Sequence, residues 1–381
     1  MKTFIPFGKP FIAGKELLYI EQAALHGHLS GDGLYTERCH KWFEGRLGCK
    51  RALLTHSCTA ALEMAAILCD LSPGDEVILP SFTFVSTANA FVLRGAVPVF
   101  VDIRRDTLNI DETLIEAAIT PKTRAIVPVH YAGVACDMNA IMAIANRHDL
   151  VVIEDAAQAL LSIDHGRALG TIGHLGCLSF HETKNIICGE GGALLINDPR
   201  YIERAEIIRE KGTNRSQFFR GAVDKYTWVD IGSSYLPGEL IGAFLYGQLE
   251  HADEITDVRR RIFRRYYELL RPLQDQNLVR LPIEDIDSSP NKHIFFLITQ
   301  SLEQRTVLLQ YLKTRNILAV IHFVPLHSSP AGVKYGRVSE SMSVTDFISD
   351  RLVRLPIYHE MRDEDIERVA DAVTSFFCGS S

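Results

Sequence analysis

The stretch Val151-Val152-Ile153-Glu154-Asp155 decides the fold: a short apolar run that ends directly in two acidic residues. Comparable apolar runs come before it, at 77–79, 97–101 and 125–129. Helical patterns separate them, at 83–93, 113–118 and 138–147. Short continuous apolar runs that alternate with helices indicate a mostly parallel sheet buried on both faces. The sequence therefore predicts an α/β fold between about 50 and 200, with ligands at the carboxyl ends of the strands, where Asp155 stands.

The remainder of the chain has a different pattern. Apolar residues recur at helical spacing between 240 and 270, which predicts one long helix or a kinked pair. The clusters Arg259-Arg260-Arg261 and Arg264-Arg265 within it are expected to form a solvated helix face. Beyond about 275 the elements are shorter and punctuated by proline. We therefore expect a large domain over 1–250 and a small C-terminal domain over 251–381 that includes the linking helix.

Composition excludes several classes of protein. The 381 residues are 47% hydrophobic, and 40 basic against 47 acidic residues give a net charge of −7. That charge argues against nucleic acid as the main partner, and no apolar run is long enough for a membrane span. The eight cysteines form no C-x-x-C pair, and the N-terminus has no signal-peptide pattern. We expect a cytoplasmic globular protein.

The first candidate site is the stretch from Thr55 to Leu62, where small hydroxyl residues precede an apolar helical segment. The free backbone N–H groups at a helix N-terminus attract anions, most often phosphate. The alternative is a plain helix cap by Ser57 or Thr59, which this stretch taken alone favours.

Two further candidates carry an acid and an amine. Asp155, in Glu154-Asp155-Ala156-Ala157-Gln158, could cap a helix, bind a metal or pair with a buried cation; with no H-E-x-x-H motif, no metal site is expected. Lys184 lies between a short apolar run and the glycines of Gly189-Glu190-Gly191-Gly192, which we interpret as a turn. It is either an exposed loop lysine or a desolvated amine with a lowered pKa that can form a Schiff base with an aldehyde.

Together the three features match the needs of one cofactor, pyridoxal phosphate (PLP). This cofactor requires a phosphate-binding loop, an acid that keeps its ring nitrogen protonated, and a lysine for its aldehyde. The combination, in one α/β domain, is much more specific than any single part.

Five stretches make the chain similar to a known family. It resembles the DegT/StrS sugar aminotransferases, which are PLP-dependent and have the fold type I, aspartate aminotransferase-like architecture. The resemblance covers essentially the whole chain and is strongest for the 4-aminotransferases that make dTDP-4-amino-4,6-dideoxygalactose. The stretches are PSFTFVSTANAFVLRGA (80–96), VPVHYAGVACDM (127–138), EDAAQ (154–158), SFHETKN (179–185) and EIIREKGTNRSQFFRG (206–221).

The resemblance implies a role for each matching residue. Lys184 matches the lysine that binds the cofactor and moves the substrate proton, and Asp155 matches the acid at the ring nitrogen. Gln158 matches the residue beside the ring hydroxyl, and Phe84 the aromatic that stacks on the ring; a core phenylalanine is the alternative for Phe84. The phosphate positions are Ser57, Cys58, Thr59 and Ser179. His327 matches a histidine near the sugar site.

Two neighbouring stretches depart from the family pattern, and one of them is the turn Leu236-Pro237-Gly238-Glu239, which differs from the usual acidic helix start. Many members have Asn-Tyr-Arg after the loop at 232, and that asparagine reaches the cofactor phosphate of the neighbouring subunit. Here the stretch is Ser233-Ser234-Tyr235-Leu236, so Ser234 would have to make the contact.

The resemblance also implies a reaction. The expected substrates are dTDP-4-keto-6-deoxyglucose and L-glutamate, the expected product dTDP-4-amino-4,6-dideoxygalactose, and the expected assembly a homodimer or an assembly of dimers. Such a product belongs to deoxysugar synthesis for enterobacterial common antigen or lipopolysaccharide O-antigen. The gluco 4-aminotransferase and a 3-aminotransferase of a 3-keto sugar share every cofactor residue and remain alternatives.

Overall fold

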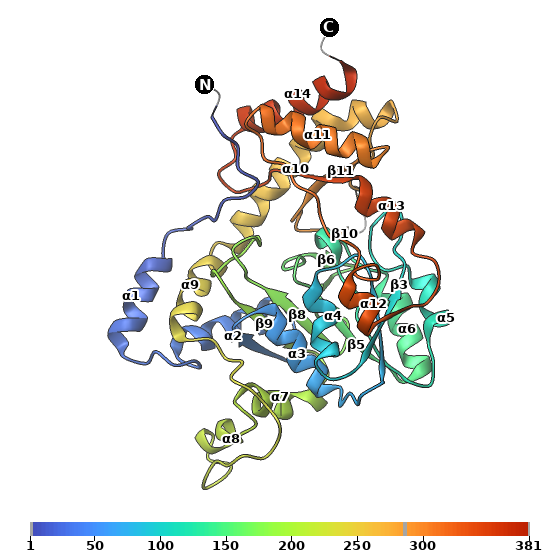
Figure 1. Cartoon of the computed structure of the whole chain (residues 1–381). Helices are drawn as coiled ribbons and strands as arrows, with labels where there is room; N and C mark the ends of the chain where they lie inside the picture. Colours follow the sequence, from blue (N-terminus) through green and yellow to red (C-terminus); the bar gives the residue numbers. More distant parts are fainter. Residues whose placement is uncertain (1–2, 285–287, 380–381) are drawn as a thin grey trace.

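The structure, a computed structural model, describes residues 3–284 and 288–379. Its central feature is an eight-stranded sheet in the order β1-β9-β8-β5-β4-β2-β3-β12 (Figure 1). The strands are β1 (Arg51–Thr55), β9 (Gly192–Ile196), β8 (Leu175–Ser179), β5 (Val151–Asp155), β4 (Thr123–Ile126), β2 (Glu76–Pro80), β3 (Val97–Val101) and β12 (Arg337–Val338). Among these described strands β9 alone runs antiparallel to its neighbours, which confirms the predicted mostly parallel sheet.

Alternate residues of each strand enter two different cores, because successive side chains point to opposite faces of a sheet. Val77, Leu79 and Ile153 pack with α3 (Cys58–Leu68) and α4 (Val85–Val92) on one face. Ile78 and Val152 pack with α5 (Ile115–Ala118) and α6 (Met138–His148) on the other face. Burial on both faces explains why the strands have continuous apolar sequences.

The other helices and short strands of the large body surround this sheet. The helices are α1 (Glu16–His26), α2 (Leu34–Leu47), α5 (Ile115–Ala118), α6 (Met138–His148), α7 (Ile202–Arg209), α8 (Arg215–Phe219) and α9 (Glu239–Leu249). Three single turns are η1 (Glu112–Leu114), η2 (Tyr131–Gly133) and η3 (Pro199–Tyr201), and the three-stranded sheet consists of β10 (Ser288–Ser289), β6 (Ile163–Asp164) and β7 (Arg167–Ala168). The segment with α7 and α8 projects from the lower end in Figure 1.

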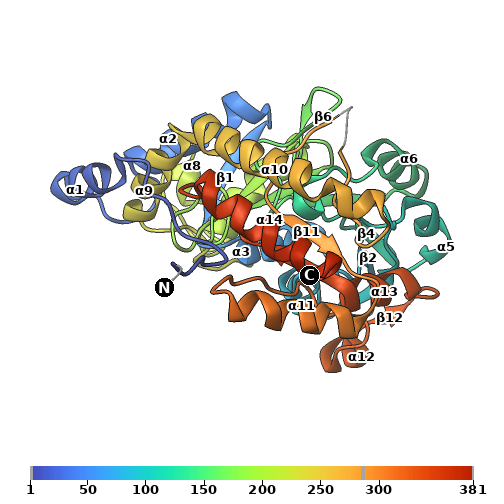
Figure 2. The same cartoon turned by 90° about the horizontal axis from the view of Figure 1, so that it is seen from above.

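The C-terminal part has its own core above the sheet. The elements of this C-terminal part are α10 (Ala252–Asp275), β11 (Phe295–Ile298), α11 (Leu302–Thr314), α12 (Pro330–Tyr335), α13 (Ser343–Arg351), β13 (Leu352–Leu355) and α14 (Asp363–Cys378). The strands β11 and β13 pair antiparallel, and α10 and α14 lie side by side beside them (Figure 2). This is the expected α+β character.

The segment from 240 to 270 forms the kinked pair rather than one helix: α9 ends at Leu249 and α10 begins at Ala252. The prediction that the arginine clusters form a solvated helix face is wrong for Arg259. Arg259 is only 7% exposed and donates hydrogen bonds to the carbonyls of His293 and Ile357. It lies on the same side of α10 as the apolar residues that pack into the C-terminal core, so its position on the helix decides its burial.

The chain crosses between the two parts more than once. Ile5 pairs with Ile317 and packs into the C-terminal core, whereas β12, far along the chain, pairs with β3 in the main sheet. The division of the chain into a large domain over 1–250 and a small domain over 251–381 therefore stays a prediction.

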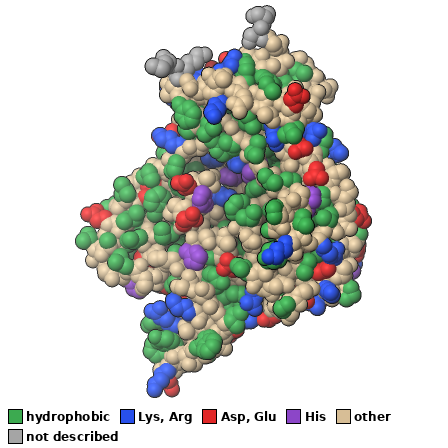
Figure 3. Space-filling view, viewed as in Figure 1, with side chains coloured by type: hydrophobic (Ala, Val, Ile, Leu, Met, Phe, Trp, Pro, Cys, Tyr) green, Lys and Arg blue, Asp and Glu red, His purple; other side chains and the backbone are tan. Residues whose placement is uncertain are grey.

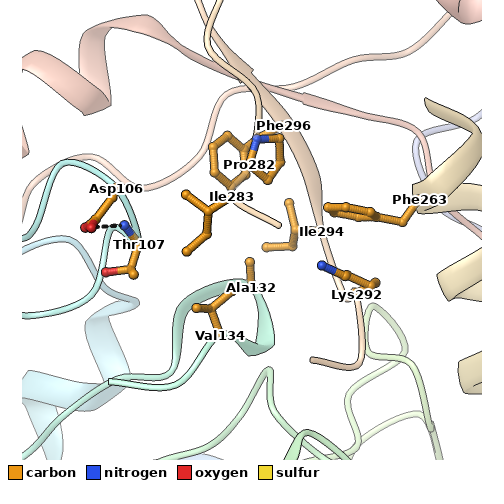
Figure 4. Close-up of a pocket in the computed structure, with 10 residues that line it drawn as sticks. All are labelled: Asp106, Thr107, Ala132, Val134, Phe263, Pro282, Ile283, Lys292, Ile294 and Phe296. Carbon is orange, nitrogen blue, oxygen red and sulfur yellow. Dashed lines mark hydrogen bonds between the residues drawn. The ribbon is translucent and has the colours of Figure 1, made fainter. Parts of the chain in front are cut away.

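Apolar side chains fill the join between the two parts. Figure 4 shows Ala132 and Val134 of the large body facing Ile283, Ile294 and Phe296. A space of only about 10 Å³ remains among them, so the two parts pack directly against each other.

Candidate active site

A cavity of about 500 Å³ lies between the carboxyl edge of the main sheet and the C-terminal part. Figure 3 shows a hollow at the middle of the molecule in which basic and histidine side chains are visible. Residues from both parts form its walls. They are Phe7, Ser57, Cys58, Thr59, Leu62, Thr83, Phe84, Ser86, Thr87, Val129, Asp155, Ala157, Gln158, Ser179, His181, Thr183, Lys184, Glu190, Gly191, His293, His322, Phe323 and Arg354.

The strands explain why residues far apart in sequence meet here. The strands β1, β5 and β8 point in the same direction and end at Thr55, Asp155 and Ser179. Each strand is followed by a predicted site residue that lines the cavity. Eight of the ten residues proposed from sequence come together in this one space: Ser57, Cys58, Thr59, Phe84, Asp155, Gln158, Ser179 and Lys184.

Lys184 follows β8 in a tight turn, where its backbone N–H donates to the carbonyl of His181 over 2.9 Å. Its amine lies inside the cavity near Cys58 and Asp155. Burial lowers the pKa of this amine, although Asp155 opposes the shift. The position of the amine therefore favours the desolvated lysine over the exposed loop lysine, and the lowered pKa raises the fraction that is neutral and nucleophilic.

Asp155 presents its carboxylate to the cavity from the end of β5. The Thr87 hydroxyl donates to Asp155 Oδ2 over 2.7 Å, and the Ala157 N–H donates to Oδ1 over 3.1 Å. Thr87 in turn lies 2.8 Å from the hydroxyl of Thr83. These contacts fix the carboxylate in one orientation and leave it able to accept a further hydrogen bond from a protonated ring nitrogen.

The neighbouring acid serves the fold. Glu154 is fully buried on the opposite face of β5, where its oxygens accept hydrogen bonds from the N–H groups of Gly170, Ile172 and Gly173. His130 Nε2 lies 2.8 Å from Glu154 Oε2. Because adjacent residues on a strand point to opposite faces, only Asp155 reaches the cavity.

The N-terminus of α3 forms another wall. Ser57 caps the helix, since its hydroxyl accepts from the Ala60 N–H over 3.1 Å. Ser57 can cap the helix and the same turn can still bind an anion. The cap uses only the Ala60 N–H, whereas the N–H groups of Cys58 and Thr59 lie in the first turn and have no partner within the helix. A Cβ on Gly192 would lie 2.4 Å from the backbone nitrogen of Cys58, so only glycine allows β9 to pass so close to this turn.

Phe84 and Gln158 complete the large-body walls. Phe84 is 58% exposed, which excludes a core phenylalanine and leaves its ring free to stack on a ligand. Gln158 is held by the Ala132 N–H, which donates to its Oε1 over 2.7 Å. Its amide NH₂ therefore remains as a donor for a ligand oxygen.

The upper wall comes from the N- and C-terminal segments. His293 Nδ1 lies 2.7 Å from Asn185 Oδ1, and His322 Nδ1 lies 2.7 Å from the hydroxyl of Tyr131. Burial holds the pKa of both imidazoles well below the ordinary value, and the charges of Lys184 and Arg354 act in the same direction. Both histidines are therefore neutral at neutral pH.

Ser234 and His327, the remaining proposed site residues, lie outside the cavity walls. Ser234 is exposed and pairs with Glu210 in an isolated bridge. His327 Nδ1 lies 2.7 Å from the Ser81 hydroxyl, and its Nε2 lies 3.4 Å from Asp346. Their proposed contacts with the cofactor and sugar stay predictions.

The walls also contain residues that no sequence pattern indicated, among them Thr87, His293, His322 and Arg354. Thr87 lies in a stretch already noted for its resemblance, so its alignment with family members would have indicated it. His322 lies five residues before His327, but no motif in that segment indicates a role for it. Nothing in the local pattern of Arg354 distinguishes it from a surface arginine.

Two absences concern the described residues alone. Over 3–284 and 288–379 no group of three or more His, Cys, Asp or Glu side chains is arranged to bind a metal ion. No helix in these same ranges is long and apolar enough to cross a membrane.

The residues present fit PLP. The lowered pKa of Lys184 suits attachment to an aldehyde, Asp155 suits a protonated ring nitrogen, and the first turn of α3 suits a phosphate. Ser179, at the end of β8, lines the same cavity as that turn.

Comparison with known proteins agrees with this chemistry. A model of the DegT/DnrJ/EryC1/StrS aminotransferase family matches residues 10–374. The chain is 34% identical over 388 residues to the spore coat polysaccharide biosynthesis protein SpsC of Bacillus subtilis (strain 168), with 99% of this chain and 98% of that protein covered.

Solved structures are similar over their full length. DesV of S. venezuelae, solved in complex with a ketimine intermediate, is 31% identical with a TM-score of 0.90, and 100% of each chain is covered. The aminotransferase TlmJ of Streptoalloteichus hindustanus is 27% identical with a TM-score of 0.91, and 99% of each chain is covered. The chain therefore belongs to the DegT/DnrJ/EryC1/StrS family and is a PLP-dependent sugar aminotransferase.

Proposed function

We propose that this enzyme converts dTDP-4-keto-6-deoxyglucose to dTDP-4-amino-4,6-dideoxygalactose, with L-glutamate as amino donor. The observation that carries the aminotransferase chemistry is the single cavity that holds both the Lys184 amine and the Asp155 carboxylate beside the first turn of α3. The choice of sugar is supported by the resemblance of the stretches around the site to the 4-aminotransferases.

The residues of the chain have distinct tasks. When bound, PLP supplies a carbonyl that accepts the amino group and a ring that delocalises the electron pair released at the donor Cα. Asp155 holds a proton on the ring nitrogen, in the orientation set by Thr87. The first turn of α3, with Ser179, holds the phosphate, and Phe84 and Gln158 contact the ring.

Lys184 is the proton carrier in both halves of the reaction. Its neutral Nζ would take the proton from the donor Cα and return it to the carbon that carried the cofactor's carbonyl oxygen. Water would then release 2-oxoglutarate, and the amino group would stay behind. In the second half Lys184 Nζ delivers a proton to C4 of the sugar. The face of delivery decides between an axial amine, which gives the galacto product, and an equatorial amine, which gives the gluco product.

We also propose a homodimer in which Ser234 reaches the partner's cofactor phosphate and His327 lies near the sugar. Large apolar side chains that are exposed together on one helix support the dimer, since exposed apolar patches commonly mark interfaces. On α1, Leu17 is 68% exposed, Leu18 47% and Leu25 81%. All eight cysteines lie in the described ranges and none forms a disulfide, which supports a reducing compartment such as the cytoplasm.

The test is an assay of the purified enzyme with PLP, L-glutamate and dTDP-4-keto-6-deoxyglucose, with the product identified by NMR. An axial C4 amine is expected. An equatorial amine would reverse the facial assignment. No product from this ketone, together with turnover of the 3-keto isomer, would overturn the substrate assignment.

The chemical role of Lys184 is tested separately. Lys184→Ala is expected to lower turnover by about 10⁴-fold or more, because acid–base transfer alone contributes about 10²–10⁴-fold. The visible absorbance of the lysine-linked cofactor should disappear while the circular dichroism spectrum is retained. Lys122→Ala, at an exposed lysine, is the matched control and should behave as wild type. An active, yellow Lys184→Ala protein would contradict the assignment.

A further inference from the structure

His293 is a buried polar side chain in the cavity wall that has no task in the reaction described above. It lies in the segment before β11, is only 4% exposed, and lines the same cavity as Lys184. The two residues also line a second, much smaller space of about 10 Å³, together with Asn185. The fold therefore places the imidazole beside the amine that reacts, although the two residues are far apart along the chain.

The hydrogen bonds of Asn185 determine which nitrogen of His293 carries the proton. Asn185 Nδ2 donates to the carbonyl of Asn291 over 3.3 Å, and its Oδ1 lies 2.7 Å from His293 Nδ1. An amide oxygen only accepts hydrogen bonds, so Nδ1 must be the donor. A neutral imidazole carries one proton, and Nε2 is therefore left as an acceptor.

The surroundings keep this imidazole neutral. Burial is the main reason that the pKa of His293 lies well below its ordinary value, and the positive charges of Lys184, Arg259 and Arg354 act in the same direction. The nearby His322 adds to this effect. A neutral imidazole keeps its acceptor and adds no second positive charge beside the Lys184 amine.

Asn291 fixes the position of the ring. Its Nδ2 donates to the carbonyls of Gln158 and Leu160, each over 2.9 Å. Its Oδ1 accepts from the His293 N–H over 3.1 Å. The ring is thus tied to the loop that follows β5, so its orientation toward the cavity is set before any ligand binds.

The acceptor nitrogen needs a donor. Nε2 of His293 makes no hydrogen bond to the residues at 3–284 and 288–379. The described side-chain donors that line both spaces with it are Lys184, Gln158 and Ser179. The proposed function assigns Gln158 to the cofactor ring and Ser179 to its phosphate, which leaves Lys184 as the donor for His293.

We propose that His293 is a positioning residue for Lys184: its Nε2, kept free of a proton by Asn185, accepts a hydrogen bond from the Lys184 ammonium while that group carries the substrate proton. This inference rests on the proposed function, in which Lys184 takes that proton from the donor Cα. The proton moves from Cα to Nζ, the electron pair of the broken bond stays with the carbon and is delocalised over the bound cofactor, and His293 gains and loses nothing. The bond to the ring holds Nζ in place for the return of the proton.

The first experiment measures the protonation of Lys184 directly. The full-length enzyme is loaded with pyridoxamine phosphate, which leaves the lysine free, and trace acetylation of Lys184 by acetic anhydride is quantified by mass spectrometry across a range of pH. His293→Asn should shift the midpoint of Lys184 reactivity about one unit to lower pH, because the ammonium loses a charged hydrogen bond. An unchanged midpoint would overturn the proposal.

The second experiment follows the donor half-reaction in single turnovers. The holoenzyme is mixed with L-glutamate, and loss of the absorbance of the lysine-linked cofactor is recorded. His293→Asn should lower the limiting rate about 10- to 100-fold and leave the half-saturating concentration of L-glutamate within about twofold, since the ring acts on the proton carrier and not on the donor. Deuterium at the donor Cα should slow the variant more than the wild type, because proton transfer becomes the slow step.

Two exchanges separate the two nitrogens of the ring. Asparagine can place its NH₂ group near the position of Nδ1 and keep the bond to Asn185, but it has no atom at the position of Nε2. Glutamine can place its amide oxygen near the position of Nε2. His293→Gln should therefore show a smaller shift of the midpoint and a faster half-reaction than His293→Asn. The reverse order would show that His293 acts only on Asn185, and would overturn the proposal.

His148→Asn is the matched control, because His148 lies on α6 and pairs with Glu116 outside the cavity walls. It should keep the wild-type midpoint and rate. Should His293→Asn fail to fold, Asn185→Ala tests the same chain of contacts: it removes the acceptor that keeps the proton on Nδ1, and it should also lower the midpoint. Acetylation needs no substrate, so it remains measurable if L-glutamate or the proposed sugar is not used, and the two proposals fail separately.

Discussion

The two walls of the cavity differ in how their polar groups are satisfied. In the large-body wall three polar side chains of the proposed cofactor set are held by protein partners: Thr87 fixes Asp155, the Ala60 N–H donates to Ser57, and the Ala132 N–H donates to Gln158. In the opposite wall Arg354 Nε is buried and has no hydrogen-bond partner among the described residues.

The difference corresponds to two kinds of ligand. A cofactor that stays bound benefits from groups already oriented by neighbours, because they lose no further freedom on binding. A substrate enters and leaves in every catalytic cycle. It can bind to a charged side chain that has no partner of opposite charge until the substrate is present. We infer that the large-body wall is built for PLP and the upper wall for substrates.

The largest change to the cofactor wall is expected from Asp155→Asn. The exchange keeps one acceptor oxygen, which the Ala157 N–H can still use, and replaces the oxygen that accepts from Thr87 by an NH₂ group. It also removes the charge that holds a proton on the ring nitrogen. We expect turnover to fall by about 10²–10³-fold, comparable to loss of an oriented electrostatic contact in other enzymes. Steady-state kinetics measures this, with Asp137→Asn at the exposed cap of α6 as control. Near wild-type turnover would remove Asp155 from the role.

The adjacent residue sharpens the contrast between site and scaffold. Glu154→Gln replaces one acceptor oxygen by an NH₂ group, so some of the N–H groups of Gly170, Ile172 and Gly173 lose their partner inside the protein. We expect the free energy of unfolding to fall by about 2–3 kcal/mol, as for unsatisfied buried groups. Chemical denaturation measures it. A loss of kcat without loss of stability would instead assign Glu154 to the active site.

The smallest expected effect concerns the contact that joins the C-terminal part to the sheet. Arg337, on β12, donates to both oxygens of Glu76 over 2.8 and 2.7 Å. Glu76→Gln should lower the free energy of unfolding at neutral pH by about 1 kcal/mol, a modest value because Arg337 is partly exposed.

The pH dependence of this effect has a definite sign. The hydrogen bond from Arg337 holds the pKa of Glu76 below its ordinary value. The stabilisation is therefore fully present above the ordinary glutamate pKa and is lost as the pH falls through the lower, folded-state value. Denaturation curves at neutral and strongly acidic pH should show the wild type and Glu76→Gln converging in acid. Exposed Glu340→Gln should match the wild type throughout, and persistence of the difference in acid would contradict this explanation.

Much of the fold follows from local sequence. The apolar runs at 97–101 and 151–155 become β3 and β5, and the helix expected at 138–147 becomes α6 (Met138–His148). These predictions succeed because a strand buried on both faces must be apolar throughout. The prediction for Arg259 was wrong because its burial depends on carbonyls of the segments before β11 and before α14, which no helical pattern records.

The candidate site divides in the same way. Lys184, Asp155 and the first turn of α3 were predictable, because each follows a strand whose carboxyl end faces the same edge of the sheet. Thr87 and Asp155 are 68 residues apart, and only the packing of α4 beside β5 shows that one orients the other.

By itself, the sequence determined the parallel sheet, the positions of the lysine and the acid at strand ends, and the cofactor that these groups require. The tertiary structure decided which acid reaches the cavity and which supports the fold, and it brought Phe7, His322 and Arg354 over Lys184 from segments far apart along the chain. The physical reason is the distance along the chain over which each kind of interaction acts. Strand and helix patterns depend on neighbours a few residues away, whereas the burial and pairing of a charge depend on whichever segments the whole fold packs around it.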